Sequence, residues 1–259
     1  MNKIQPLSFP NGSEPTPLGL ESLVSLDTIF VKQKIELLEG KIKHCKLQFV
    51  FLTLRFRYFT SAIVGCETRN RYVIMNDQGE ELFKAEEESD CCTRQCCGPL
   101  RPFELTIRDA NDQDVITFSR PLACGLCCFP CCLQSIAVYA PLGQLAGTVE
   151  QEWTWWTPKF TVKNWDGVDI FKIVGPCCTL ACFSDVEFQI FSSKMENDET
   201  ISTDEIGRIS KKWGGLAREM LTDADNFGIS FPVDLDVRLK AVLLGALFLI
   251  DFMYFEHNQ

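Results

Sequence analysis

The same short pattern occurs five times along this chain: a strand-forming segment, a tight turn and a second strand-forming segment. Each segment is rich in β-branched and aromatic residues with alternating apolar positions, which is typical of strands with one buried face. The intervening turns carry Gly, Asn or Asp, which tolerate the backbone angles of tight turns. These turns fall at 76–79, 109–112, 141–143, 164–167 and 192–204.

Five hairpins and one or two flanking strands, one of them predicted at Ile29–Leu38, give about ten to twelve antiparallel strands. A sheet of that many strands leaves unpaired edges unless it curls and closes. Of the 259 residues, 46% are hydrophobic and 23% are charged, so the chain can bury a large core. We therefore predict a mainly β domain, a barrel or a sandwich, with one short helix at Trp213–Leu221.

The most apolar segment lies near the C-terminus, between Lys240 and Glu256. As a helix, its residues would cover about 22 Å, which is short of the ~30 Å hydrocarbon core of a bilayer. Asp251 near its end adds a cost of insertion. A helix that is apolar on all sides is buried somewhere, and the lumen of a large barrel needs filling. We favour a helix inside the protein, and a single membrane span is the alternative.

The side chains expected to carry this core or membrane helix are apolar. They are Val242, Leu243, Leu244, Leu247, Phe248, Leu249, Ile250 and Phe252.

The chain has 14 cysteines, most of them in three runs. No basic segment followed by an apolar one precedes Pro17, so we expect neither a secretory leader nor a disulfide framework. Palmitoylation, metal ligation and simple packing all remain open. Flanking Leu, Phe and Pro residues and adjacent cysteine doublets favour palmitoylation for the central run. Its members are Cys124, Cys127, Cys128, Cys131 and Cys132.

A twelve-residue acidic segment at 223–234 matches an EF-hand loop in part. Its first, third and twelfth positions are carboxylates: Asp223, Asp225 and Asp234. The sixth is Gly228, as such a loop requires. The fifth, seventh and ninth lack a side-chain oxygen: Phe227, Ile229 and Phe231. Ligand count predicts weak calcium (Ca2+) binding, with a dissociation constant of about 10⁻⁴ to 10⁻³ M. A polar turn before a strand is the alternative.

Composition argues against two other classes of function. The formal net charge of −10 disfavours nucleic acid as the main partner, because duplex-binding proteins usually present a basic face. The sequence shows no P-loop and no GxSxG motif, and its 2 histidines are too few for an acid–base site. We therefore expect a protein without bond-making chemistry.

Several longer motifs together resemble the phospholipid scramblase family. They lie at 90–98, 120–122, 124–134, 158–161, 175–177, 222–237 and 249–253. The resemblance covers nearly the whole chain. It implies a Tubby-like fold: a closed antiparallel barrel of twelve strands around a C-terminal hydrophobic helix at about 240–255. The domain would span 20–259, preceded by a short Pro-containing arm at 1–19. An atypical insertion at about 41–63, basic and apolar, separates the first two strands.

The resemblance also implies a function: calcium-activated, ATP-independent, bidirectional movement of phospholipids between leaflets. It implies calcium binding at the six positions named above and palmitoylation of the central cysteine run. The protein would lie at the cytoplasmic face of the plasma membrane. If its C-terminal hydrophobic helix spans the bilayer, it would be a type II single-pass membrane protein. The alternative is a palmitoyl-anchored, calcium-responsive binding or signalling protein that does not itself move lipids.

The sequence also carries weaker signals for protein partners. The segment 207–216 resembles the family's nuclear import signal, with positive charges at Arg208, Lys211 and Lys212. The resemblance implies that an import receptor binds this segment and that the protein reaches the nucleus when it carries no palmitate. The alternative is that these residues form a solvated basic face. The short N-terminal arm lacks the spacing that SH3 or WW domains bind. Self-association on calcium binding would supply the headgroup path that one apolar helix lacks.

Overall fold

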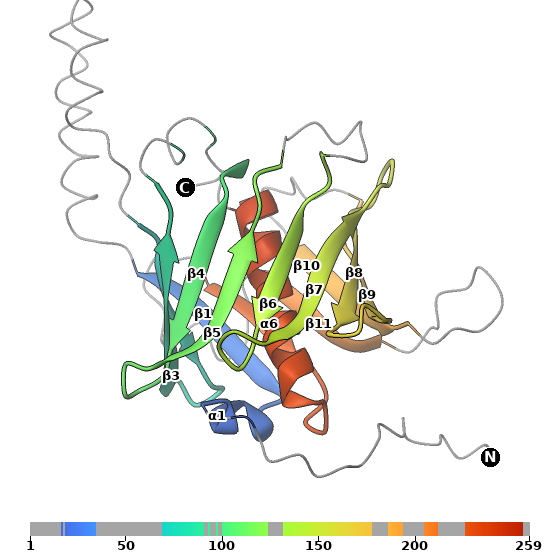
Figure 1. The fold of residues 1–259 in the computed structure, drawn as a ribbon. Helices are drawn as coiled ribbons and strands as arrows, with labels where there is room; N and C mark the ends of the chain where they lie inside the picture. The colour runs from blue at the N-terminus through green and yellow to red at the C-terminus, as the bar shows by residue number, and fades with distance from the viewer. Residues whose placement is uncertain are drawn as a thin grey trace, which may run out of the picture.

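The computed structural model describes residues 17, 19–34, 69–90, 93, 97, 100–123, 132–177, 186–193, 205–211 and 226–255. In this part of the chain, twelve strands form a closed antiparallel barrel in which sequence neighbours pair and β1 closes the ring against β12 (Figure 1). The strands are β1 Thr28–Lys34, β2 Arg71–Met75, β3 Glu81–Glu88, β4 Phe103–Arg108, β5 Asp114–Arg120, β6 Ser135–Tyr139, β7 Leu145–Glu152, β8 Lys159–Asn164, β9 Asp169–Val174, β10 Val186–Ser192, β11 Glu205–Lys211 and β12 Asn226–Ser230. The predicted closed barrel of about twelve strands is confirmed.

Alternation along each strand separates the core from the outer face. In β4, the side chains of Phe103, Leu105 and Ile107 are buried, whereas their neighbours in sequence point outward. The expected turn chemistry also occurs, since Gly79 and Gly167 have φ angles of +79° and +77°. The outer face carries cross-strand ion pairs, such as Arg108 to Asp114 at 2.8 Å.

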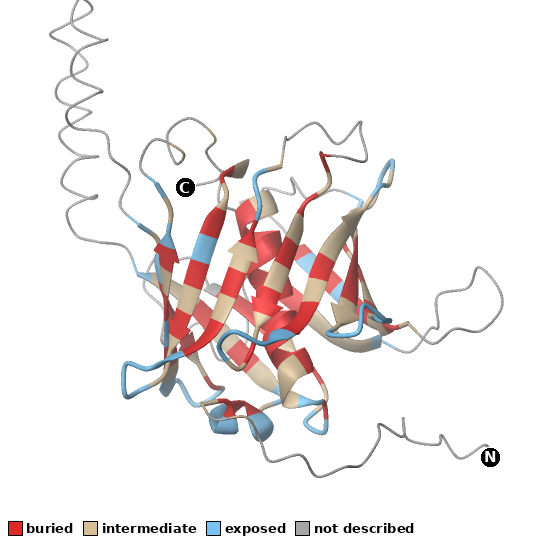
Figure 2. Cartoon of the chain, viewed as in Figure 1, coloured by how far each residue is buried: buried red, intermediate tan, exposed pale blue. Residues whose placement is uncertain are grey.

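A central helix, α6 (Val237–Ile250), runs through the barrel and continues as a π-helical turn, η3 (Asp251–Phe255) (Figure 1). The twelve consecutive residues Leu239–Ile250 are all buried, so α6 has no solvent-facing side over this length (Figure 2). The carboxylate of Asp236 caps the first turn by accepting the Arg238 backbone N–H at 2.8 Å. The predicted core helix is therefore confirmed, although it begins three residues before the expected position 240.

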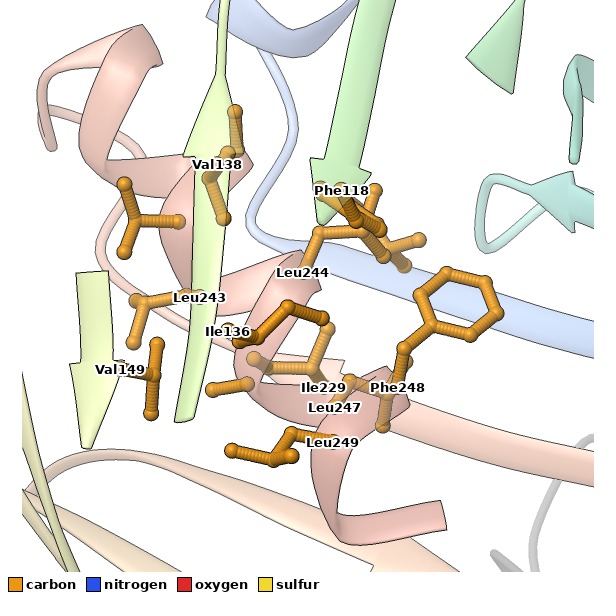
Figure 3. Close-up of a cluster of buried hydrophobic side chains, with 14 of the residues drawn as sticks. Phe118, Ile136, Val138, Val149, Ile229, Leu243, Leu244, Leu247, Phe248 and Leu249 are labelled. Carbon is orange, nitrogen blue, oxygen red and sulfur yellow. The ribbon is translucent and has the colours of Figure 1, made fainter. Parts of the chain in front are cut away.

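Helix α6 packs closely against the barrel wall at β6 and β7. Leu243, Leu244 and Leu247 lie among Ile136, Val138 and Val149 of these strands in the close-up (Figure 3). Two glycines allow α6 to lie close to the wall strands. A Cβ atom on Gly245 of α6 would lie 2.5 Å from Val138 Cγ2, and one on Gly147 of β7 would lie 2.9 Å from Val242 Cγ2.

The antiparallel topology gives the barrel two different ends. At the turn end lie the tight hairpins, the start of α6 and a short helix, α1 (Glu21–Val24). At the opposite end, which we call the cysteine end, lie η3 and the strand ends that bracket the three cysteine runs. The same topology places the short β7–β8 connection, 153–158, at the cysteine end.

Some predicted elements differ from those in the structure, and others fall on residues that the structure does not describe. β1 ends at Lys34 within the described residues, whereas the sequence predicted a strand at Ile29–Leu38. Neither β12 nor α1 was predicted. The N-terminal arm, the predicted helix at 213–221 and the insertion at 41–63 lie outside the described residues, apart from Pro17 and Gly19. β1 and β2, which flank the insertion, pair in regular antiparallel register.

We expect Gly245→Ala to lower the free energy of unfolding by about 1–3 kcal/mol, because the added methyl group meets Val138 inside a filled barrel. Urea denaturation measures the loss. Adding Val138→Ala should make room for the methyl group, so the double variant should lose less than the sum of the two single losses by at least about 0.5 kcal/mol. Additive losses would contradict this close contact.

Candidate functional site: a helix held at both ends inside a barrel

Lys240, in the first turn of α6, is fully buried and makes four polar contacts. Its ammonium group donates to the carbonyl oxygens of Leu23, Val24, Leu26 and Val233, at 3.0, 2.8, 2.7 and 2.8 Å. The first three acceptors follow or end α1, so this lysine provides the positive charge that a helix C-terminus favours. A single side chain thus ties the start of α6 to α1 and to the preceding loop.

The environment of Lys240 acts on its charge in opposing directions. Burial lowers the pKa of Lys240, while the carboxylates of Asp234 and Asp27 act to raise it. The ammonium group also lies 5.4 Å from the ring centroid of Phe231, at the face where a cation is attracted. Asp234 is the twelfth position of the predicted calcium segment, so that segment and the helix meet at this lysine.

A buried ion pair lies on the barrel wall near the other end of the helix. Arg101 donates to Glu87 at 2.6 and 2.9 Å, with both side chains at most 2% exposed. The hydroxyl of Ser89 donates to the same carboxylate at 2.5 Å. The guanidinium carbon of Arg101 lies 5.0 Å from the ring centroid of Phe252 in η3. This pair therefore contacts the end of the central helix directly.

A second buried arginine supports the same aromatic ring. Arg120 donates to the Gln134 side-chain oxygen at 3.2 and 2.7 Å. Phe103 stacks on Phe252 with ring centroids 4.3 Å apart, and Arg120 lies 5.5 Å from the Phe103 ring. Asp251, at the start of η3, is itself only 4% exposed. No local sequence pattern indicates this cluster, although Arg120 falls within one of the motifs that resemble the scramblase family.

The structure divides the predicted calcium segment between the barrel wall and a turn. Phe227 and Ile229 lie on β12, between β1 and β11, with their side chains buried in the core. Phe231 is also buried, and Asp234 is exposed in the turn before α6. Asp223 and Asp225 lie outside the described residues. Calcium binding stays a prediction, and the described part places its last position beside Lys240.

The cysteine run is described only at its final residue. Cys132 is 5% exposed and disulfide-bonded. A sulfur atom in a disulfide carries no thioester, so palmitoylation of Cys132, which stays a prediction, requires that this disulfide first be reduced. The other four expected sites, Cys124, Cys127, Cys128 and Cys131, lie outside the described residues. Among the residues that are described, no three His, Cys, Asp or Glu side chains come together to hold a metal ion.

The basic residues of the import-like segment contact acidic or aromatic partners. Arg208 of β11 is 43% exposed and lies 2.9 Å from Glu205 and 3.5 Å from Glu187. Lys211 lies over the ring of Phe227, with its ammonium nitrogen 5.6 Å from the centroid. Lys212 is not among the described residues. An import signal stays a prediction, and Arg208 is ion-paired in this state.

Fold and site together define a closed β-barrel whose lumen is filled by its own C-terminal helix. Within the described ranges, no helix has both the length and the apolar character needed to cross a membrane. A family model described as "Scramblase" matches residues 54–257. No solved structure matches the chain.

The most informative relatives are named phospholipid scramblases. Phospholipid scramblase 1 of Rattus norvegicus is 47% identical over 242 residues, which are 93% of this chain and 64% of the relative. Phospholipid scramblase 2 of Bos taurus is 45% identical and is covered to 73% of its length, with 94% of this chain. Phospholipid scramblase family member 5 of Homo sapiens is 42% identical, with 97% of this chain and 83% of the relative covered. The chain belongs to the scramblase family, and it spans less than two thirds of the rat protein's length.

We expect Lys240→Met to lower the free energy of unfolding by about 2–4 kcal/mol, because it keeps the apolar stem but leaves buried carbonyl groups without their donor. Chemical denaturation followed by circular dichroism measures the change. Arg238→Met is the matched control, since Arg238 lies two positions away and is only partly buried. A loss for Lys240→Met no larger than that of the control would show that the four contacts add little stability.

We expect Arg101→Met to cost about 3–5 kcal/mol of stability, because it leaves the Glu87 carboxylate buried without its charged partner. The double variant Glu87→Met with Arg101→Met removes both charges and should lose clearly less than Arg101→Met alone. Thermal unfolding at constant pH compares wild type, the two single variants Arg101→Met and Glu87→Met, and the double variant. A double variant as unstable as the sum of its single changes would contradict a coupled pair.

Proposed function

We propose that this chain moves phospholipids in both directions between the leaflets of a membrane, activated by calcium and without ATP. The observation that carries the proposal is the family relationship: relatives named phospholipid scramblases align with 93–94% of the chain at 45–47% identity. The chemistry is that of a lipid transporter, which makes or breaks no covalent bond. Phospholipids and the membrane surface are its proposed partners.

The contacts of Lys240 suggest how calcium would act on the helix. The segment 223–234 leads through Leu235 and Asp236 directly into α6. Its Val233 carbonyl accepts from Lys240, and the Asp234 carboxylate opposes the lowering of that lysine's pKa by burial. Calcium held by this segment would draw on the Asp234 carboxylate and shift the loop that fixes the start of α6. In our proposal the ion thereby changes how the helix is held in the barrel.

Attachment to the membrane would depend on acylation. We propose palmitate on Cys124, Cys127, Cys128, Cys131 and, once its disulfide is reduced, Cys132, because several acyl chains give an anchoring that one chain does not. The protein would lie at the cytoplasmic face of the plasma membrane. Without palmitate, an import receptor would bind Arg208, Lys211 and Lys212 and carry it to the nucleus. Self-association on calcium binding would assemble a polar path for headgroups.

A second candidate function is favoured by the position of α6. The residues Leu239–Ile250 are enclosed by the barrel, and buried polar contacts hold the helix near each end. A helix in this position presents no apolar face to lipid. The corresponding proposal is a palmitoyl-anchored, calcium-responsive protein that recognises membranes or signals there without moving lipids itself.

Lipid movement in proteoliposomes separates the two functions. Purified full-length chain is reconstituted without ATP, and the exchange of a fluorescent phospholipid between leaflets is followed with and without millimolar calcium. We expect calcium to accelerate exchange, and we expect Asp223→Ala with Asp225→Ala to abolish the acceleration, because two of three carboxylate ligands are lost.

The matched control replaces two exposed carboxylates at the turn end, Asp77→Ala with Glu81→Ala, and should leave the calcium response unchanged. Folded wild-type protein that moves lipid no faster than empty vesicles would overturn the scramblase function and leave the anchored protein as the better account. Calcium-stimulated exchange that survives loss of Asp223 and Asp225 would overturn only the calcium segment.

A further inference from the structure

The connection between β7 and β8 exposes two tryptophans almost completely. Trp155 is 77% exposed and Trp156 is 80% exposed, and Trp153 beside them is 43% exposed. They lie at the cysteine end of the barrel, in a loop that is exposed near its tip (Figure 2). We call residues 153–156 the tryptophan loop. Adjacent tryptophans at this exposure are typical of a binding surface, because a soluble protein seldom exposes neighbouring large aromatic side chains to water.

The tryptophan loop is held in shape by its own contacts. The rings of Trp153 and Trp155 meet edge to face with centroids 4.9 Å apart, and the Thr154 hydroxyl donates to the Thr157 carbonyl. At its base, Glu152 pairs with Lys172 and accepts from Thr161. Burial acts to raise the pKa of Glu152, but the bonds from Lys172 and Thr161 outweigh it and lower the pKa. The loop therefore presents its tryptophans from a fixed base.

Charge distinguishes the tryptophan loop from the connections at the turn end. No charged residue occurs between Glu152 and Lys159. The turn end, by contrast, carries exposed carboxylates on several of its connections: Asp77, Asp112, Asp166, Asp234 and Asp236. A surface of anionic lipid repels the turn end, whereas an uncharged loop can approach it. Among the described residues at the cysteine end, Leu122 on the β5–β6 connection adds a second apolar side chain, 63% exposed.

The turn end also exposes a tryptophan, but in a different setting. Trp165 is 41% exposed, lies beside Asp166 in the β8–β9 turn, and has the guanidinium carbon of Arg238 at 5.2 Å from its ring centroid. Its ring is thus already engaged within the protein. This residue provides a matched control for the tryptophan loop.

We propose that the tryptophan loop inserts into the interfacial layer of a phospholipid bilayer and sets the orientation of the barrel, with the cysteine end toward the lipid. This inference rests on the membrane role in the proposed function. The amphipathic indole ring prefers the level of the headgroups, where its body is shielded from water and its N–H finds an acceptor. In this orientation, η3 and the strand ends that bracket the cysteine runs face the membrane, and the acidic turn end faces away.

Binding to preformed neutral vesicles tests the proposal without calcium or acylation. Unacylated full-length chain is mixed with phosphatidylcholine vesicles in a calcium-chelating buffer, and bound protein is measured by flotation. We expect Trp155→Ala with Trp156→Ala to weaken the apparent partition at least about tenfold, because two aromatic side chains lose their burial. Trp165→Ala should bind within about twofold of wild type, and all variants should unfold at the wild-type temperature, because these loops are exposed.

Quenching by brominated lipids reports the depth of the same side chains. Brominated phosphatidylcholine should quench wild-type tryptophan fluorescence strongly and that of the Trp155, Trp156 double variant only weakly. Wild-type protein that does not bind these vesicles, or a double variant that binds as wild type does, overturns the proposal. Lipid-free wild-type dimers that the double variant cannot form, with vesicle binding unchanged, would assign the loop to self-association instead.

These outcomes are separate from failure of the proposed function. Flotation measures attachment to the outside of closed vesicles, whereas lipid exchange is measured in protein reconstituted from detergent. Loss of vesicle binding in the double variant supports the tryptophan loop even if no exchange is detected. Calcium-dependent exchange by wild-type protein, with vesicle binding untouched by the double substitution, leaves the proposed function standing and removes this inference.

Discussion

The rest of this structure depends on filling the lumen of a closed barrel with the chain's own helix. A barrel of twelve strands is too wide for its wall side chains alone to meet at the centre. Helix α6 resolves this by being apolar on every side over Leu239–Ile250. Its closest approach to the wall is made possible by Gly147 and Gly245, where any larger residue would clash. Barrel and helix are therefore a single core.

The buried charges near both ends of the helix limit how it can move. Releasing Lys240 breaks contacts to four carbonyl groups, and hydrogen bonds to a charged group are each worth about 1.5–3 kcal/mol. The proposed weak calcium site would contribute little against this, since a ligand at ten times its dissociation constant stabilises the state that binds it by only about 1.4 kcal/mol. Calcium alone would thus favour a small shift of the helix over its extraction. A membrane surface or a second copy of the chain would have to supply the remainder of any larger change.

The sequence predicted most of the barrel because alternation within a strand is a local signal, as in β4 and β10. It missed β12, because Gly228 and the neighbouring acidic residues resemble a loop, and the pairing partners of Ile229 lie on β1 and β11. Lys240 looked like the polar boundary of an apolar segment. Its burial depends on the carbonyl groups of Leu23 and Val24, more than 200 positions away, and no local pattern reports such a contact.

The two ends of the barrel acquire different chemistry from topology. Every second connection of an antiparallel barrel lies at the same end, so residues that are far apart in sequence lie close together at that end of the molecule. β1 ends and β2 begins at the cysteine end, the same end as the tryptophan loop. The tight acidic turns collect at the other end. The net charge of −10 is therefore unevenly distributed: the uncharged tryptophan loop can approach an anionic surface while the acidic turns at the other end point away.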